Sequence, residues 1–172
     1  MLPVLIVLTA IELGSGIVLD TFESTLLRYP TLLVLVPVTI GMAGNLGSIL
    51  AARLSTALHL GLLSFDADDE RLAGNAVATI ALAVTVFPLV GAGAWLLQTA
   101  LSTARLTLPM VVAVALTSGV VLAALAVAVT TITTYAAYRF ELDPDDVVIP
   151  VVTNVCDVLG VLVLFGVVRL LV

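Results

Sequence analysis

The chain alternates between long apolar stretches and short polar breaks, and the apolar stretches reach the length of about 20 residues that a membrane-crossing helix needs. They cover residues 2–19, 31–60, 73–98, 108–138 and 148–171. This pattern predicts an all-α integral membrane protein with five transmembrane helices. The stretches leave no room for a soluble domain, so we expect one membrane domain over residues 1–172. An odd number of spans places the two termini on opposite sides.

Composition supports the same class. Hydrophobic residues make up 62% of the chain, charged residues 10%, and the mean hydropathy is +1.29, which is far from the range of soluble domains. The net charge is −6, with six arginines and no lysine. This balance argues against nucleic acid, or an anionic lipid patch, as a partner. The arginines divide equally between the two sides, so the positive-inside rule gives no orientation.

The last apolar stretch carries a polar stripe. Pro150, Thr153, Asn154 and Asp157 follow the i, i+3, i+4, i+7 spacing of one helical face. A carboxylate in the middle of a bilayer costs about 2.5–3.5 kcal/mol, so such a residue usually faces water, a cation or a partner charge. Asp157 therefore indicates an ion path. The alternative is a salt bridge or an interhelical hydrogen bond, with Arg53 or His59 as the partner.

The second apolar stretch carries small and polar residues. Glycines recur at spacings of three, and polar residues lie among them: Pro37, Gly41, Gly44, Asn45, Gly47 and Ser48. A helix face without side chains lets a neighbouring helix or a hydrated ion approach the backbone. A packing groove between helices would explain the glycines alone, but the Asn45 amide in lipid needs partners or water.

Acidic residues gather in two breaks, Asp66, Asp68, Asp69 and Glu70 in one, and Glu141, Asp143, Asp145 and Asp146 in the other. Both breaks are predicted on one side of the membrane, where they could attract or sense a cation. The alternative is an acid-rich surface adapted to a salty cytoplasm. In the first stretch, Glu12 and Asp20 lie about two turns apart on one face, where they could form an entrance or pair with Arg28.

Three segments together resemble the MgtE magnesium channel family. The segment from Pro37 to Arg53, with Gly41-x-x-Gly44-Asn45-x-Gly47-Ser48, is similar to the family's second transmembrane helix. The last helix and the first break also match, through Asp143-Pro144, Pro150, Asp157-Val158-x-Gly160 and Phe22-Glu23-Ser24. The resemblance covers essentially the whole chain in helix count and loop placement. The chain looks like the short archaeal type, a membrane domain without a cytosolic sensor domain, and eukaryotic relatives of solute carrier family 41 fuse two such halves.

The resemblance implies a dimer with the ion path on its two-fold axis, lined mainly by helices two and five of each protomer. It assigns Mg²⁺ contacts to Asp157, Thr153, Asn154, Gly44 and Asn45. Pore-lining or helix-packing roles fall to Pro37, Gly41, Gly47, Ser48, Pro150 and Gly160. The acids expected at an entrance or in sensing are Glu23, Asp66, Asp68, Asp69, Glu70, Asp143, Asp145 and Asp146.

We therefore expect a divalent cation channel or transporter in the plasma membrane that conducts hydrated Mg²⁺, with Mn²⁺ and Co²⁺ as further ions. The expected assembly is a homodimer in membrane lipid. The alternatives are one half of a heterodimer, an ion-coupled divalent cation exchanger, and a non-conducting membrane subunit. An enzyme is disfavoured, because the sequence offers neither a nucleophile with a paired base nor a catalytic metal cluster.

Overall fold

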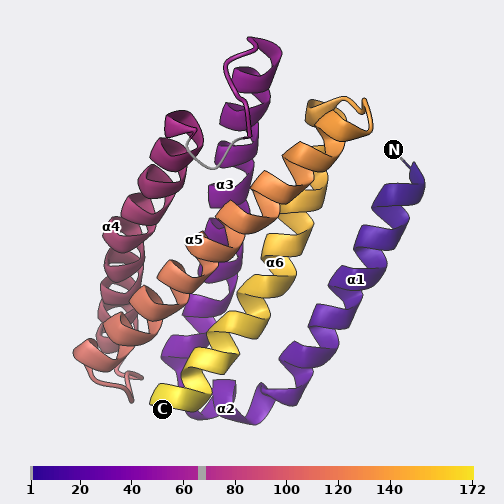
Figure 1. Ribbon diagram of the computed structural model, residues 1–172. Helices are drawn as coiled ribbons and strands as arrows, with labels where there is room; N and C mark the ends of the chain where they lie inside the picture. The colour runs from indigo at the N-terminus through magenta and orange to yellow at the C-terminus, as the bar shows by residue number, and fades with distance from the viewer. Residues whose placement is uncertain (1, 66–68) are drawn as a thin grey trace.

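The computed structural model describes residues 2–65 and 69–172, and of residues 2–4 and 144–146 it describes the backbone alone. Figure 1 shows long helices that run up and down an elongated bundle, with the termini at opposite ends. Within the described residues the helices are α1 (Leu2–Thr21), α2 (Glu23–Arg28), α3 (Pro30–His59), α4 (Glu70–Ala100), α5 (Leu108–Arg139) and α6 (Pro144–Leu171). The prediction of an all-α protein is confirmed.

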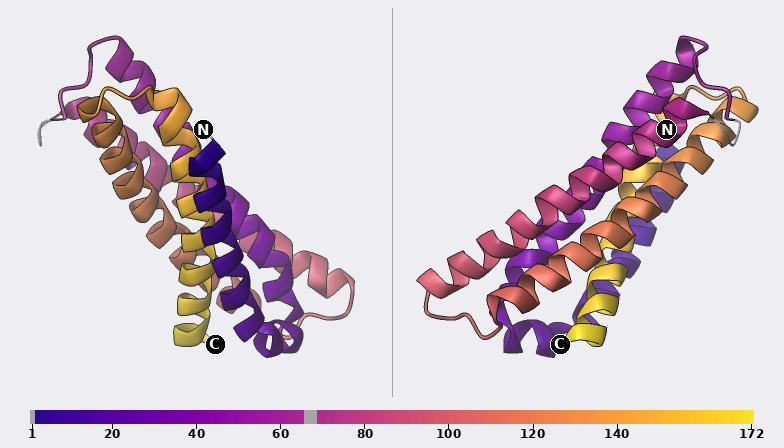
Figure 2. Two further views of the ribbon diagram at one scale, coloured as in Figure 1. Left: turned by 90° about the vertical axis from the view of Figure 1, so that its right-hand side faces the viewer. Right: turned by 60° about the vertical axis from the view of Figure 1, so that its left-hand side comes forward.

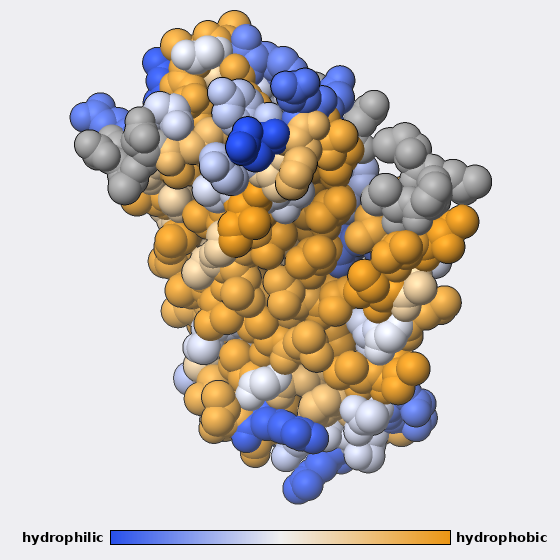
Figure 3. Space-filling model, turned by 45° about the vertical axis from the view of Figure 1, so that its right-hand side comes forward, coloured by the Kyte–Doolittle hydropathy of each residue, from blue (hydrophilic) through white to orange (hydrophobic). Residues whose placement is uncertain are grey.

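Four helices of the described chain are long and apolar enough to cross a membrane: Pro30–His59, Glu70–Ala100, Leu108–Arg139 and Val147–Leu171. Figure 3 shows the corresponding surface, a broad hydrophobic belt with hydrophilic residues toward both ends. The predicted fifth span corresponds to α1. This helix is not among the four, so its crossing of the membrane stays a prediction. Its apolar side chains Ile6, Leu13 and Ile17 are exposed in the single chain.

Helix boundaries follow the local chemistry. Pro30 occupies the first position of α3, where a missing N–H costs nothing. After α3 the chain turns at Gly61, which has a φ of +66° in the region that glycine adopts most readily. α6 begins at Pro144, four residues before the predicted start at residue 148, so Pro150 lies inside the helix and not in its first turn.

The first break contains a short helix that the apolar pattern did not predict. In α2 and its cap, the Phe22 ring stacks on Phe165 of α6 with ring centroids 4.0 Å apart. The Arg169 guanidinium lies over the Phe22 ring, 4.8 Å from the ring centroid. The Phe22-Glu23-Ser24 segment is thereby fixed against the C-terminal part of α6.

The core lies between α3, α4, α5 and α6. α6 packs against both α3 and α5, while α4 packs mainly on α5. Figure 2 shows α1 on the outside of this group, beside α6, and its tertiary contacts are with α6 and α2. The loops that join α3 to α4 and α5 to α6 lie at one end of the bundle, which we call the acidic-loop end, and α2 lies at the other (Figure 1).

Candidate functional site

The packing of α3 against α6 brings Gly44 to Asp157. Both residues lie at the midpoints of their helices, and Gly44 is buried while Asp157 is half-buried. A Cβ atom added to Gly44 would lie 2.7 Å from Oδ1 of Asp157 and 3.3 Å from Cγ2 of Thr153. The absent side chain thus creates the space that the Asp157 carboxylate occupies.

Two further glycines hold the same pair of helices together. A Cβ at Gly47 would lie 2.5 Å from Cγ1 of Val152, and a Cβ at Gly160 would lie 3.1 Å from the Cα of Ile40. Gly41 differs, because its Cβ position has nothing within 4 Å. The predicted glycine face is therefore a contact with α6 at Gly44 and Gly47 only.

Asp157 forms no hydrogen bond or salt bridge among the residues that the structure describes. The sequence offered Arg53 or His59 as an alternative partner, but neither pairs with Asp157 among the described residues. Arg53 instead donates a long hydrogen bond to Oδ1 of Asn75, at 3.5 Å, and His59 is exposed at the end of α3. A half-buried carboxylate at mid-helix without a protein partner is the arrangement expected of a cation or water contact.

The other polar residues of α6 turn partly toward their own helix. The Thr153 hydroxyl donates to the Ile149 carbonyl at 2.8 Å, and Nδ2 of Asn154 donates to the Pro150 carbonyl at 2.9 Å. Donation fixes each side chain, while the hydroxyl and amide oxygens keep lone pairs that can accept from water or bind a cation. Thr153, Asn154 and Pro150 are half-buried.

On α3, Asn45 is exposed and Ser48 is half-buried at mid-helix, and the Ser48 hydroxyl donates to the Asn45 carbonyl at 3.1 Å. Pro37 is exposed inside the helix. A carboxamide facing hydrocarbon is costly, so this surface requires water or another polar surface beside it. The structure thus joins Gly44, Thr153 and Asp157 in one contact and places Asn45 and Gly41 on more open surface.

Residues 36–167 match the family model described as MgtE, divalent cation transporter. The chain belongs to this family. The match contains most of both helices of the site and all of its predicted residues from Pro37 in α3 to Gly160 in α6. MgtE-family proteins are transporters and not enzymes, and the apolar helices agree with a membrane protein.

A curated relative points the same way. The chain is 30% identical over 160 residues to a protein of Rattus norvegicus named solute carrier family 41 member 3. The match covers 87% of the chain, which spans about a third, 34%, of the length of that relative. The resemblance to the MgtE and solute carrier 41 family is thereby confirmed.

One more acid of this MgtE-family chain lies on a neighbouring helix. Glu12 is half-buried at the midpoint of α1, which packs against α6. The sequence also offered a pair of Glu12 and Arg28, which the described residues do not form. The Arg28 guanidinium lies over the Tyr29 ring instead, 5.3 Å from the ring centroid. An acid in the middle of an apolar stretch was the signal available in the sequence.

The described acids among those expected at an entrance or in sensing are not part of this contact. Glu23 lines a cavity of about 350 Å³ together with Asp20, at the end of the bundle that carries α2. At the acidic-loop end Glu70 and Asp143 are exposed. Asp66 and Asp68 lie outside the described residues, and so do the side chains of Asp145 and Asp146. Within the described chain, no three His, Cys, Asp or Glu side chains are grouped to hold a metal ion.

Asp69 has a structural role at the acidic-loop end. Oδ1 accepts from the N–H groups of Arg71 and Leu72 at 2.9 and 3.2 Å, and Oδ2 accepts from the Ser64 N–H at 2.8 Å. The Ser64 amide is the main cause of a pKa below the usual value for this carboxyl group, and the Leu72 amide adds to the effect. Asp69 caps the N-terminus of α4, so both of its oxygens are already engaged.

Proposed function

We propose that the chain conducts hydrated Mg²⁺ across the plasma membrane, as a channel or transporter, along a path lined by α3 and α6. The observation that carries this proposal is the Asp157 carboxylate, which lies at the midpoint of α6 against the side-chain-free surface of Gly44 and has no partner among the described residues. Membership of the divalent cation transporter family supports it.

The proposed path requires two copies of the chain. One carboxylate is a weak site for a divalent cation, and the described residues of one chain group no set of three acidic, His or Cys ligands. A two-fold axis beside α3 and α6 would bring two Asp157 carboxylates together and would cover the exposed Asn45. Thr153, Asn154 and the backbone near Gly44 and Asn45 would add neutral oxygens.

The chemistry of this site favours Mg²⁺ that keeps its water. Mg²⁺ takes oxygen ligands at about 2.0–2.1 Å and loses water reluctantly. Asp157, Thr153 and Asn154 can instead contact the water shell through hydrogen bonds. Mn²⁺ and Co²⁺ are the further ions proposed, because neutral oxygen ligands with a carboxylate do not exclude them.

The route into the path is proposed from the acids at the two ends. Asp20 and Glu23 would form one entrance, at the cavity that they line. At the other end the exposed Glu70 and Asp143 would attract or sense the cation. Asp69 is left out of this set, because capping α4 engages its oxygens.

The experiment is magnesium flux into proteoliposomes under an imposed membrane potential and no other ion gradient. The parent protein is compared with Asp157→Asn and Asp157→Ala, and with Glu141→Gln as a matched loss of one exposed acid. We expect flux in the parent and in Glu141→Gln, and its loss in both Asp157 variants. Parent-like flux in Asp157→Asn would overturn the proposed site.

The same assay addresses the second candidate, half of a heterodimer or an ion-coupled exchanger. The observation that favours it is the 30% identity to a protein that is named as a solute carrier. Flux that appears only when a sodium or proton gradient is added would assign an exchanger. Flux that appears only with a second protein half would assign the heterodimer, and its absence under all conditions would indicate a non-conducting subunit.

A further inference from the structure

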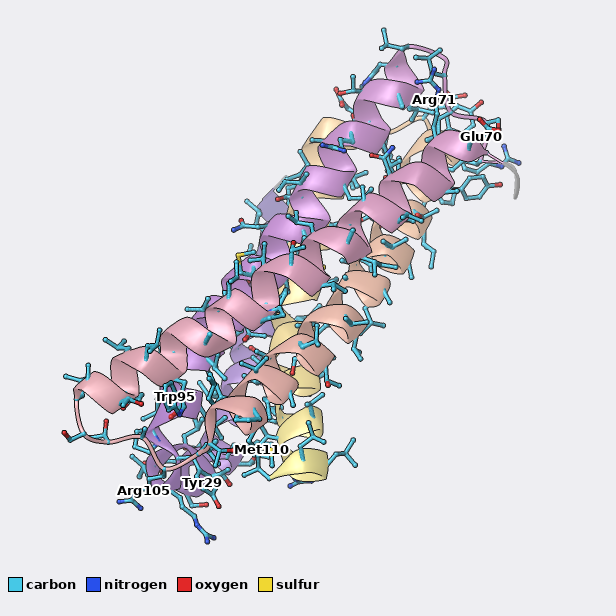
Figure 4. All side chains as sticks on the ribbon, turned by 90° about the vertical axis from the view of Figure 1, so that its left-hand side faces the viewer. Tyr29, Glu70, Arg71, Trp95, Arg105 and Met110 are labelled. Atoms are coloured by element: carbon cyan, nitrogen blue, oxygen red, sulfur yellow. The ribbon has the colours of Figure 1, made fainter. Side chains whose placement is uncertain are left out.

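An open pocket of about 660 Å³ lies between the last turns of α3 and the first turns of α4, away from the contact of Gly44 and Asp157. Two arginines line it, Arg53 from α3 and Arg71 from α4. None of its described lining residues is acidic. Figure 4 shows Arg71 at the acidic-loop end of the bundle, opposite the end that carries Trp95 and Arg105.

The two arginines are held by the protein but not neutralised by it. Asn75 accepts from Nη1 of Arg53 at 3.5 Å, and its own amide donates to the Arg71 carbonyl at 2.8 Å. Among the described residues neither guanidinium forms a salt bridge. Of the described acids nearest Arg71 in the chain, Glu70 is exposed and Asp69 is engaged as the cap of α4. The described lining of the pocket therefore carries two positive charges and no negative one, in a protein whose net charge is −6.

Part of the pocket lining is apolar. Ala52, Ala57, Leu60 and Leu62 lie beside the polar groups. A second cavity of about 210 Å³ shares Arg53 and lies closer to the middle of α3 and α4, lined also by Leu46, Ile49, Ala78, Thr79 and Leu82. We call the two cavities together the groove, which leads from guanidinium groups along mostly apolar side chains toward the middle of both helices.

A ligand that fits this groove needs an anionic head and an apolar tail. Guanidinium groups bind phosphate through paired N–H donors, and arginines at the membrane surface attract anionic headgroups. A free phosphate would use the arginines but not the apolar part of the groove. Arg53 lies six residues before the end of α3, about 9 Å below it along the axis, a depth from which an arginine reaches the headgroup layer.

We propose that the groove between α3 and α4 binds an anionic phospholipid, with its phosphate on Arg53 and Arg71 and one acyl chain along Ile49, Ala78 and Leu82. The average charge of the chain argued against an anionic lipid patch, but the fold gathers two of the six arginines around one pocket. This inference does not depend on cation transport by the protein.

The test is native mass spectrometry of the detergent-purified protein with dioleoylphosphatidylglycerol and dioleoylphosphatidylcholine as probes. The parent protein should bind the glycerol lipid in preference to the choline lipid. The Arg53→Gln/Arg71→Gln variant should bind the glycerol lipid about 30-fold more weakly, about fivefold for each arginine near an anionic headgroup. Arg105→Gln/Arg139→Gln is the control with the same loss of charge, and it should retain the parent affinity.

A second variant tests the tail. Ala78→Trp would fill the apolar part of the groove, and it should weaken binding of the whole lipid but not of glycerol phosphate. Equal affinity of the parent and the Arg53→Gln/Arg71→Gln variant for the glycerol lipid would overturn the proposal. If Ala78→Trp leaves binding of the glycerol lipid unchanged, the acyl chain does not lie in the groove and the arginines are assigned to free phosphate instead. Dissociation of a dimer, without loss of lipid, in the arginine variant would assign the groove to a second copy of the chain.

Discussion

The Cβ position of Gly44 lies 2.7 Å from Oδ1 of Asp157, so a side chain on the middle of α3 and the carboxylate on the middle of α6 would exclude one another. Thr153 closes the same space from the preceding turn of α6, 3.3 Å from that position. The position of the carboxylate therefore depends on a residue that contributes no functional group.

This relationship predicts that Gly44→Ala impairs transport. The added methyl group must push the Asp157 carboxylate or the whole of α6 aside, and overpacking of this kind costs about 1–3 kcal/mol. A displacement of that cost at the proposed cation site should lower magnesium flux by about fivefold or more. The measurement is initial flux into proteoliposomes with the amount of reconstituted protein matched.

Gly41→Ala is the matched control, three residues earlier on the same helix. Its Cβ position has nothing within 4 Å, and alanine stabilises a helix interior by about 0.5–1 kcal/mol relative to glycine. We expect parent flux and equal or higher stability. Equal loss of flux in both variants would mean that the glycines act through helix flexibility and not through the space beside Asp157.

The sequence alone predicted two special faces but not how they meet. Glycines spaced by three drift around a helix by about 60° at each step, so one neighbour cannot contact all of them. The structure turns Gly44 and Gly47 toward α6 and leaves Gly41 open. Which glycine faces which residue depends on the crossing of α3 and α6, and the crossing depends on contacts along the whole length of both helices.

The long helices could be predicted from hydropathy. The structure differs from that prediction in segments where hydropathy carries no signal. α2 spans six residues of mixed character, too few to show a period. α6 begins in the polar segment at Pro144, because proline suits the first position of a helix whatever the polarity of the residues that follow. The place of Glu12 on a helix beside α6 could not be predicted either, since the sequence does not say on which helix α1 packs.

Phe22 provides a prediction about stability. Its ring stacks on Phe165 and contacts the Arg169 guanidinium, and an aromatic pair and a cation–π contact contribute about 0.5–1.5 and 0.5–1 kcal/mol. Phe22→Leu keeps an apolar side chain and loses both contacts, so the free energy of unfolding should fall by about 1–2 kcal/mol. The measurement is unfolding of the micelle-bound protein with increasing sodium dodecyl sulfate.

Phe140→Leu is the comparison for Phe22→Leu, because the Phe140 side chain is 72% exposed and should change stability little. If both substitutions lower stability equally, the contact with α6 contributes nothing of its own.

Asp69 provides a prediction about pH. Its pKa is lowered in the folded protein, mainly by the Ser64 amide. The carboxylate therefore stabilises the start of α4 above its ordinary pKa of 3.8, and this stabilisation is lost as pH falls from there through the lowered pKa. Hydrogen exchange of the peptide 64–75, measured at each pH against the unfolded peptide, should show less protection in acid.

Two variants separate the charge of Asp69 from its capping role. Asn is also a good N-cap and does not titrate in this range, so Asp69→Asn should keep protection and lose its pH dependence. Asp69→Ala should lack protection at every pH. Pronounced pH dependence in Asp69→Asn would assign the effect to another acid of the loop.

Glu12 provides the prediction that best separates the roles of α1 and α6. It lies at the midpoint of α1, which packs against α6, and Asp157 lies at the midpoint of α6. Its carboxylate should therefore raise the local attraction for a cation without itself being the central ligand. A charge beside a partly buried site contributes about 1 kcal/mol or more. Glu12→Gln should therefore raise the magnesium concentration for half-maximal flux about fivefold and leave the maximal flux near that of the parent.

The charge-conserving variant Glu12→Asp distinguishes attraction from packing. It keeps the negative charge and shortens the side chain, so its half-maximal concentration should stay close to that of the parent. Raising the ionic strength should narrow the difference between Glu12→Gln and the parent, because added salt screens the charge. If Glu12→Asp and Glu12→Gln shift the concentration equally, Glu12 acts by holding α1 against α6, and the electrostatic role is wrong. If Glu12→Gln abolishes flux as Asp157→Asn is expected to do, both carboxylates are direct ligands, and the proposed path widens to include α1.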